Sequence, residues 1–401
     1  MNRMVVGSLL LLLASLANCT IEDLKQSSTG GAGGSGNDDA AGDGGKDAHG
    51  GSTSTIPGGG VESIAGSSLG GKGGSGGATG TGGSAGEPGG EGGGGLALIV
   101  GGAAGEAGAP NEPQPSCVGL PTTCGADGKD SCCAAALVPG GTFNRSNDAA
   151  APATVSDFRL DNYEVTVGRF RKFVAAYSKD MLAAGAGKNP HNAADTGWDS
   201  AWNAKLPQDA TALKAALLCG ENQPVPSGDP YSTWIGGNDN RPINCVDWYV
   251  SNAFCTWDGG RLPTEAEWNY AAAGGSQQRP YPWGSEVPSS NANLTAYQCY
   301  FDGSGSCSGM HNMAPVGTIA AGKSRWGQFD MAGNLWEWVR DGYDTYGKPC
   351  SDCAQLGATA DRTYRGGGFV DNVASVTTTA RGHAPNHFSH NVGIRCARAV
   401  E

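Results

Sequence analysis

The chain contains no aromatic residue before Phe143, although 10 Trp, 11 Tyr and 9 Phe follow from that point on. A segment with so few large apolar side chains cannot bury enough surface to offset the conformational entropy that folding removes. We therefore predict a disordered tether, rich in Gly, Ser and Ala, over residues 19–116. Its Gly-x-Gly patterns lack the flanking strand and helix of a phosphate-binding loop.

Basic charge is also scarce, because 26 Lys and Arg stand against 38 Asp and Glu, which gives a net charge of −12. An acidic chain of this kind repels phosphate backbones. The composition therefore predicts no nucleic-acid partner.

The apolar run near the N-terminus, Met4–Leu16, follows Arg3 and is too short for a transmembrane helix. This arrangement is typical of a secretory signal peptide, which we place at residues 1–18. The sequence Leu-Ala-Asn-Cys that ends at Cys19 is typical of a bacterial lipobox, although its asparagine departs from the usual small residue. We predict export, lipidation of Cys19 and anchoring to a bacterial membrane, with the chain facing the periplasm or the cell surface. Simple secretion is the alternative.

Cysteine is missing from residues 20–116, but the chain has 13 cysteines in all. Setting Cys19 aside leaves an even number, and export favours disulfides over metal sites. Four of the cysteines predict a disulfide-knitted collar over residues 117–136, with a zinc site as the alternative and the pairing open. These four are Cys117, Cys124, Cys132 and Cys133. Cys299 could also pair with Cys307, and Cys350 with Cys353. The last two have the spacing of a redox motif, but the strand and helix that flank a redox site are missing around them, which favours a structural bond.

Three helices are predicted from capping signals. Thr166 can cap a helix that carries Phe170, Phe173, Val174 and Tyr177 on one face. Asp247 can cap a second helix from Trp248 to about Trp257, and Thr264 can cap a third that ends at Ala273. Elsewhere short apolar segments are separated by Gly, Asn, Pro and Asp. This pattern predicts an irregular α+β domain over residues 137–401, which is long enough to bury one core.

Several long motifs lie within this domain. They are GGRLPTEAEWNYAAAGGSQQRPYPWG at 259–284, DMAGNLWEW at 330–338, RGG at 365–367 and GIRCA at 393–397. Together they resemble the formylglycine-generating (sulfatase-modifying) enzyme family, in that family's order, over about residues 138–400. The resemblance implies a C-type-lectin-like α+β fold that is low in regular secondary structure. It also implies a disulfide between Cys255 and Cys396, which would close a long loop.

The same resemblance implies calcium binding in the loop of residues 330–337. The ligands would be the side chains of Asp330 and Glu337 and the carbonyls of Gly333 and Leu335. Hard cations prefer such oxygens, although the carboxylates could instead only brace the loop. A second calcium site would map to Asn293, the Leu294 carbonyl, Asp302 and the Ser304 carbonyl.

The catalytic cysteines of the family are missing. Its enzymes oxidise a substrate cysteine with copper held by two cysteines just after the Arg-Gly-Gly motif, and copper(I) prefers thiolates. Here no cysteine lies between Cys353 and Cys396, so we expect neither copper binding nor formylglycine formation. Asp371 falls near the position of a family catalytic cysteine and is a candidate to line the remaining cleft.

We expect a non-catalytic binding or display module, stabilised by calcium and disulfides, for a peptide or glycan outside the cell. The alternative is a divergent oxidoreductase of the same family that holds non-heme iron or another transition metal through His383, His387 and His390. Pro385 argues against a helix that would align the first two histidines, which favours ordinary loop roles for them.

Overall fold

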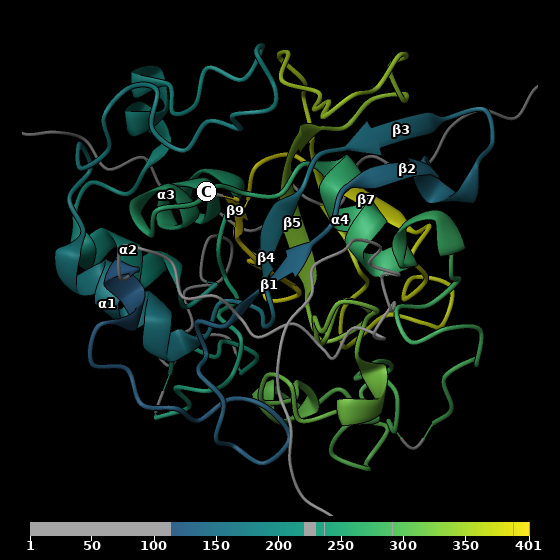
Figure 1. The fold of residues 1–401 in the computed structure, drawn as a ribbon. Helices are drawn as coiled ribbons and strands as arrows, with labels where there is room; N and C mark the ends of the chain where they lie inside the picture. Colours follow the sequence, from purple (N-terminus) through teal and green to yellow (C-terminus); the bar gives the residue numbers. More distant parts are fainter. Residues whose placement is uncertain (1–113, 220–229, 236, 291, 388, 401) are drawn as a thin grey trace, which may run out of the picture. The chain divides into compact units, whose positions relative to one another are not determined.

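A computed structural model describes residues 114–219, 230–235, 237–290, 292–387 and 389–400 (Figure 1). The described residues all belong to one compact unit, which lies within Gly94–Glu401. The predicted signal peptide, Cys19 and the tether up to residue 113 lie outside the described residues. Within the described ranges, no helix combines the length and the apolar character needed to cross a membrane.

Short strands form three small sheets. The first has the order β1 (Ala135–Val138), β4 (Phe158–Asp161), β9 (Ala397–Ala399), and the second pairs β2 (Gly141–Asn144) with β3 (Pro152–Val155), all antiparallel. The third has the order β7 (Arg381–Ala384), β6 (Arg362–Arg365), β5 (Trp336–Gly342), β8 (Val392–Gly393). In this third sheet β8 runs parallel to β5 and the other neighbours are antiparallel.

The three predicted helices are confirmed as α1 (Val167–Ala176), α3 (Trp248–Trp257) and α4 (Glu265–Ala273). Thr166 and Asp247 accept backbone N–H bonds at the first turns of α1 and α3, and Thr264 with Glu267 forms the capping box of α4. A further helix, α2 (Ala210–Ala216), was not predicted. The 3₁₀ turns η1 to η6 span Pro115–Cys117, Arg145–Asn147, Ser200–Lys205, Gly275–Gln277, Met310–Asn312 and Ala320–Gly322.

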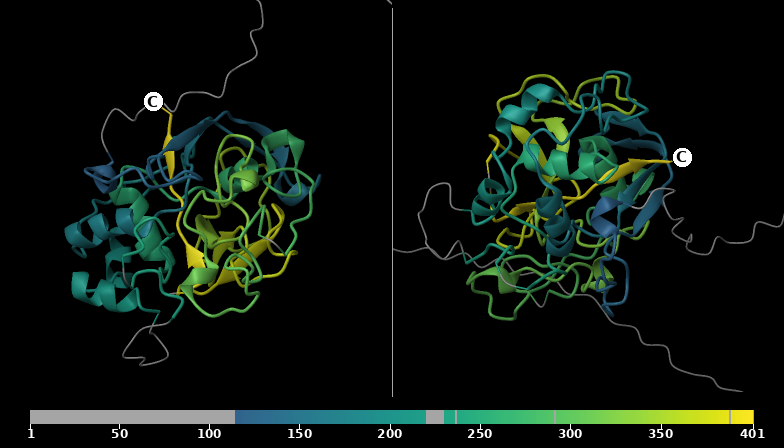
Figure 2. Two further views of the ribbon diagram at one scale, coloured as in Figure 1. Left: turned by 90° about the horizontal axis from the view of Figure 1, so that it is seen from below. Right: turned by 90° about the vertical axis from the view of Figure 1, so that its left-hand side faces the viewer.

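Two large apolar clusters fill the interior. One packs α1 against α3, where the rings of Phe170, Phe173 and Phe254 lie 5.3 to 5.6 Å apart. The other packs α4 on the hairpin of β2 and β3 and contains Trp268 and Tyr270. Figure 2 shows α1, α2 and α3, in teal, on one side of the domain and the green and yellow segments on the other. The predicted α+β class with little regular secondary structure is confirmed.

Each of the twelve cysteines in the described residues forms a disulfide. The pairs are Cys117–Cys133, Cys124–Cys132, Cys219–Cys245, Cys255–Cys396, Cys299–Cys307 and Cys350–Cys353. The pair Cys255–Cys396 is the one that the family resemblance implies. The collar is knitted by its own four cysteines, as predicted, whereas the link between Cys219 and Cys245 was not foreseen.

The start of the folded unit corrects the predicted tether boundary at residue 116. Gln114 is buried, and its side-chain oxygen accepts hydrogen bonds from Arg169 and Arg398 at 3.2 and 3.0 Å. The backbone N–H of Ser116 donates to Asp258, which also pairs with both arginines. These residues satisfy buried charges of the domain, so they fold with it despite their polar composition.

Candidate functional site

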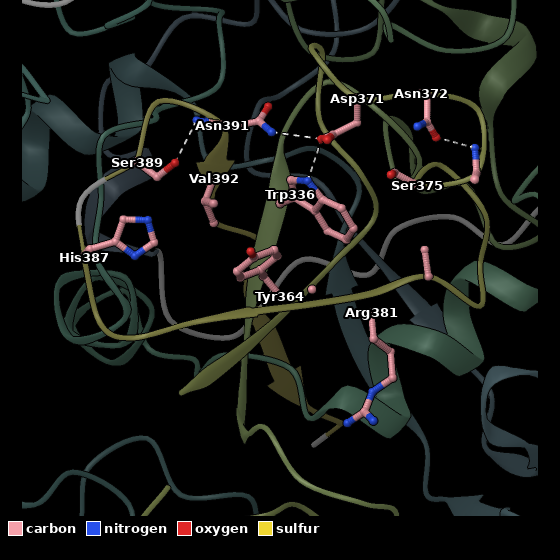
Figure 3. Close-up of a pocket in the computed structure, with 13 residues that line it drawn as sticks. Trp336, Tyr364, Asp371, Asn372, Ser375, Arg381, His387, Ser389, Asn391 and Val392 are labelled. Atoms are coloured by element: carbon pink, nitrogen blue, oxygen red, sulfur yellow. Dashed lines mark hydrogen bonds between the residues drawn. The ribbon is translucent and has the colours of Figure 1, made fainter. Parts of the chain in front are cut away.

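A cleft of about 460 Å³ lies over one face of the third sheet (Figure 3). Every strand of this sheet contributes to its lining: Trp336 from β5, Tyr364 from β6, Arg381 and Gly382 from β7, and Val392 from β8. This volume lies within the range of about 300–1,000 Å³ that small-ligand pockets occupy. The sheet therefore serves as a rigid base for a binding site.

Successive side chains of β5 point to opposite faces of the sheet, so some face the cleft side and others face the interior. Trp336 lines the cleft, and the fully buried Trp338 contacts the same tyrosine, since the ring centroids of Trp336 and Trp338 lie 5.1 and 5.2 Å from that of Tyr364. Glu337, between them, points to the opposite face, where the indole N–H of Trp268 donates to it at 2.6 Å. One short strand thus supplies both an aromatic cleft wall and a fully buried carboxylate.

The loop after β6 carries Asp371 into the cleft. This loop begins with two glycines in the left-handed region, Gly366 at φ 108° and Gly367 at φ 74°. A Cβ on Gly367 would lie 2.6 Å from the Ser375 carbonyl oxygen, so the turn requires glycine. The Asp371 carbonyl accepts the Gln298 N–H at 3.0 Å, which ties the loop to the neighbouring segment.

Three donors converge on one carboxylate oxygen of Asp371. Its Oδ2 accepts the Trp336 indole N–H at 2.7 Å, the Asn391 amide at 2.9 Å and the Gly368 backbone N–H at 2.9 Å. Figure 3 shows the first two of these bonds at the upper edge of the cleft. The structure therefore confirms that Asp371 lines the cleft, and its orientation is fixed by groups on β5 and on the loops beside the sheet.

Arg381 also lines the cleft but does not neutralise Asp371. Its guanidinium donates to Glu265 at 2.6 and 2.8 Å, and Figure 3 shows it directed away from Asp371. Both partners lie at a second cavity of about 360 Å³, which also contains Asp341. Burial raises the pKa of Asp341 to about 7, and the nearby Glu265 adds to this effect.

A family model for the FGE-sulfatase domain, described as the sulfatase-modifying factor enzyme 1-like domain, matches residues 121–400, which include the cleft, its sheet and five of the disulfides in full. The chain belongs to this family. The match begins at residue 121, inside the segment predicted as the collar. The cleft lies where the family resemblance places a catalytic cysteine, and none of the described residues that line it is a cysteine.

Named relatives include both active and inactive proteins. The chain is 30% identical over 288 residues to the inactive C-alpha-formylglycine-generating enzyme 2 of Mus musculus, covering 66% of this chain and 85% of that protein. It is also 30% identical over 293 residues to the formylglycine-generating enzyme of Mus musculus, covering 65% and 73%. Among solved structures, PvdO from Pseudomonas aeruginosa matches with a TM-score of 0.45 and 21% identity, covering 70% of this chain and 99% of that one. Since the two mouse proteins are equally similar, activity has to be argued from the site.

The predicted calcium loop places Asp330 and Glu337 in a buried cluster. Asp330 accepts the Gly317 N–H at 2.6 Å, and Arg395 binds both oxygens of Glu337 at 2.6 to 3.0 Å. Burial raises the pKa of Asp330 to about 6. Glu337 is thus already paired with a guanidinium, which the sequence did not predict.

A third carboxylate, Glu164, joins this cluster and was missed. It accepts the Leu335 N–H at 3.1 Å and the Asn334 amide at 2.6 Å. Burial, together with the negative charges of Asp330 and Glu337, raises the pKa of Glu164 well above its usual value. It lies in the segment Asn-Tyr-Glu-Val-Thr at 162–166, whose acidic residue ahead of a helix was the available signal.

The side chains of this cluster are oxygen ligands of the kind that a hard cation prefers. Three buried carboxylates face one guanidinium, so the ionised cluster carries an excess of negative charge that a divalent cation would balance. Among the described residues, however, no three His, Cys, Asp or Glu side chains are grouped closely enough to hold a metal ion. Calcium here would be held by Asp330 and Glu337 with the carbonyls of Gly333 and Leu335.

In the second predicted calcium set, Asp302 and Ser304 lie on an exposed loop closed by the Cys299–Cys307 disulfide, whereas Asn293 and Leu294 precede that loop. Asp302 accepts the Ser304 N–H at 2.9 Å and its hydroxyl at 2.6 Å, which lowers the Asp302 pKa. Asn293 accepts the Ser289 hydroxyl at 3.3 Å, and Leu294 is buried beside it. The contacts of Asp302 with Ser304 are thus those of a residue that closes its own turn.

The structure separates the three histidines. His383 pairs with Asp361 at 2.6 Å and stacks on Tyr343, whereas the ring of His390 lies 4.8 Å from that of Tyr231. His387 lines the cleft with its Nδ1 2.7 Å from the Pro385 carbonyl oxygen. They do not form a metal-binding group within the described residues.

Proposed function

We propose that this protein is an exported, lipid-anchored binding module, in which an FGE-sulfatase domain without the catalytic cysteine pair holds a peptide or glycan in its cleft. The observation that carries the proposal is the cleft itself. It is a cavity of about 460 Å³ at the family's catalytic position, lined by aromatic and polar side chains and by no cysteine.

Oxidation of a substrate cysteine is the less favoured function, because copper(I) requires thiolates. Every cysteine in the described residues is held in a disulfide. Coexpression with a sulfatase tests this directly. We expect peptide mass analysis to find the sulfatase target cysteine unmodified. An aldehyde at that cysteine would instead support formylglycine formation by this protein.

The six disulfides support export to an oxidising compartment. A lipid on Cys19 would then attach the domain to the membrane through the predicted tether, whose root-mean-square reach is roughly 50–60 Å. The test is the location of the protein. We expect the wild type in the membrane fraction and Cys19→Ala in the soluble fraction, and equal distribution of the two would contradict the lipid anchor.

Calcium is proposed as a stabiliser of the loop around Asp330. A ligand that binds only the folded state stabilises it by about 2.7 kcal/mol at a concentration 100 times its Kd. We therefore expect calcium to raise the melting temperature of the chelated protein by several degrees, and Asp330→Asn to weaken this response. The same melting experiment on Asp302→Asn tests whether the second predicted calcium loop contributes to this response. A melting temperature that is the same in chelator and in calcium would contradict the proposal.

Ligand binding is tested on peptide and glycan arrays with the full chain. The matched variant is Ala374→Trp, because Ala374 is exposed, lines the cleft and can fill it without removing a hydrogen-bonding side chain. We expect array signals that Ala374→Trp abolishes while its melting temperature stays unchanged. Signals that survive in this variant would place binding elsewhere on the molecule.

A further inference from the structure

Two carboxylates of the domain each accept a hydrogen bond from a tryptophan indole, but only one of them is paired with a cation. Glu337 accepts the Trp268 indole N–H at 2.6 Å, and Asp371 accepts the Trp336 indole N–H at 2.7 Å. Glu337 is then neutralised by the guanidinium of Arg395. Asp371 takes part in no ion pair with any Lys, Arg or His of the described residues.

The donors around Asp371 use only one of its oxygens. All three hydrogen bonds end on Oδ2, and Oδ1 has no hydrogen-bond partner within the described residues. These neutral donors hold the carboxylate in place without cancelling its charge. A fixed, uncompensated carboxylate with a free oxygen is the counterpart of a guanidinium or ammonium group.

The rest of the cleft suits the stem of such a cation. The rings of Trp336 and Tyr364 line it beside Asp371, and aromatic rings attract cations as well as apolar stems. Ser375 and Ser389 add hydroxyl groups at the rim. The cationic side chain that could compete for Asp371, that of Arg381, is held by Glu265.

We propose that the cleft selects a peptide through one basic side chain, Arg or Lys, whose cationic group binds Asp371 between Trp336 and Tyr364. The inference rests on the proposed function, since it names the ligand class of the same cleft. A peptide is favoured over a neutral glycan because only the peptide supplies the positive charge that Asp371 lacks.

The test measures binding of the full chain to immobilised peptide pairs that differ only in one residue, Arg against citrulline and Lys against norleucine. Two variants are compared with the wild type. Asp371→Asn removes the charge but keeps an oxygen for the three donors. Glu286→Gln removes an equal charge from an exposed position outside the cleft lining.

We expect the wild type and Glu286→Gln to prefer the basic member of each pair by at least about 10-fold, the size of one charge-assisted hydrogen bond. Asp371→Asn should lose this preference. Peptide binding that is abolished by Ala374→Trp yet is equal for basic and neutral peptides would overturn the inference and leave the proposed function standing. No binding to any peptide or glycan by the folded wild type would overturn both.

Discussion

The carboxylates on the two faces of strand β5 differ in whether a cation pairs with them. On the interior face Glu337 has an indole donor and a guanidinium, and all three side chains are buried. On the cleft face Asp371 has an indole donor and two further neutral donors, but no cation among the described residues. An ionised Glu337 in the interior needs a cation such as Arg395, because an unpaired buried charge is strongly destabilising. The cleft can stay incomplete because water, and then a ligand, reaches it.

The largest expected effect comes from breaking the interior side of this comparison with Arg395→Met. The variant leaves Glu337 buried without its cation, which we expect to reduce the free energy of unfolding by about 3–5 kcal/mol. Urea denaturation measures it. The control is Arg171→Met, since Arg171 and Asp239 form an exposed pair that should contribute less than about 1 kcal/mol. Equal losses in the two variants would contradict the special role of the buried pair.

Asp341 is a second test of how a buried carboxylate behaves without a paired cation. Its hydrogen-bond partners are the backbone N–H groups of Glu265 and Gln355. Its pKa of about 7 in the folded protein exceeds the value of about 3.9 expected after unfolding. Between these values only the folded state holds the proton, so raising the pH favours unfolding.

We therefore expect Asp341 to lower stability progressively from about pH 4 to pH 7, by an amount on the order of 2–4 kcal/mol. Asp341→Asn cannot ionise and should lose this part of the pH dependence. The measurement is urea denaturation of wild type and variant at several pH values. A stability difference between the two that does not change with pH would rule out this titration.

The two indoles offer a matched pair of smaller effects. Trp268→Phe removes a donor from a buried carboxylate, which we expect to destabilise the domain by about 1–3 kcal/mol. Trp336→Phe removes the corresponding donor in the cleft, where water can replace it, so the loss should stay below about 1 kcal/mol. Thermal and urea unfolding of both variants measure which one loses more stability. A larger loss for Trp336→Phe would reverse the comparison.

The smallest expected effect on stability is that of Asp371→Asn. An amide oxygen still accepts from the three donors, and no ion pair is broken, so the change should stay within about 0.5 kcal/mol. A melting-temperature comparison with the wild type measures it. A loss of several kcal/mol would show that Asp371 is a structural residue rather than a free binding group.

The sequence predicted the parts of the molecule that rest on local signals. Helix caps at Thr166, Asp247 and Thr264 act within one turn, so they can be recognised from a few letters. Missing cysteines are equally visible, and Asp371 was placed in the cleft by its distance from the Arg-Gly-Gly motif.

What could not be predicted depends on contacts across the chain. Arg395 and Glu337 are 58 residues apart, and Glu164 meets Asn334 across 170 residues. Cys219 and Cys245 lie in segments without any regular pattern that would announce their pairing. Charge balance in a core is a property of the assembled fold, so no single motif encodes it.

The last strand has a consequence for how the protein is made. β9 pairs with β4, and Arg398 joins Gln114 and Asp161, which lie 284 and 237 residues earlier in the chain. Contacts of such sequence separation form slowly, because a long loop must close before they contribute any stability. During synthesis the domain therefore cannot be completed until residues 396–399 have emerged. Over that interval the Cys255–Cys396 disulfide cannot form, and the buried carboxylate of Asp161 lacks the Arg398 guanidinium that pairs with it.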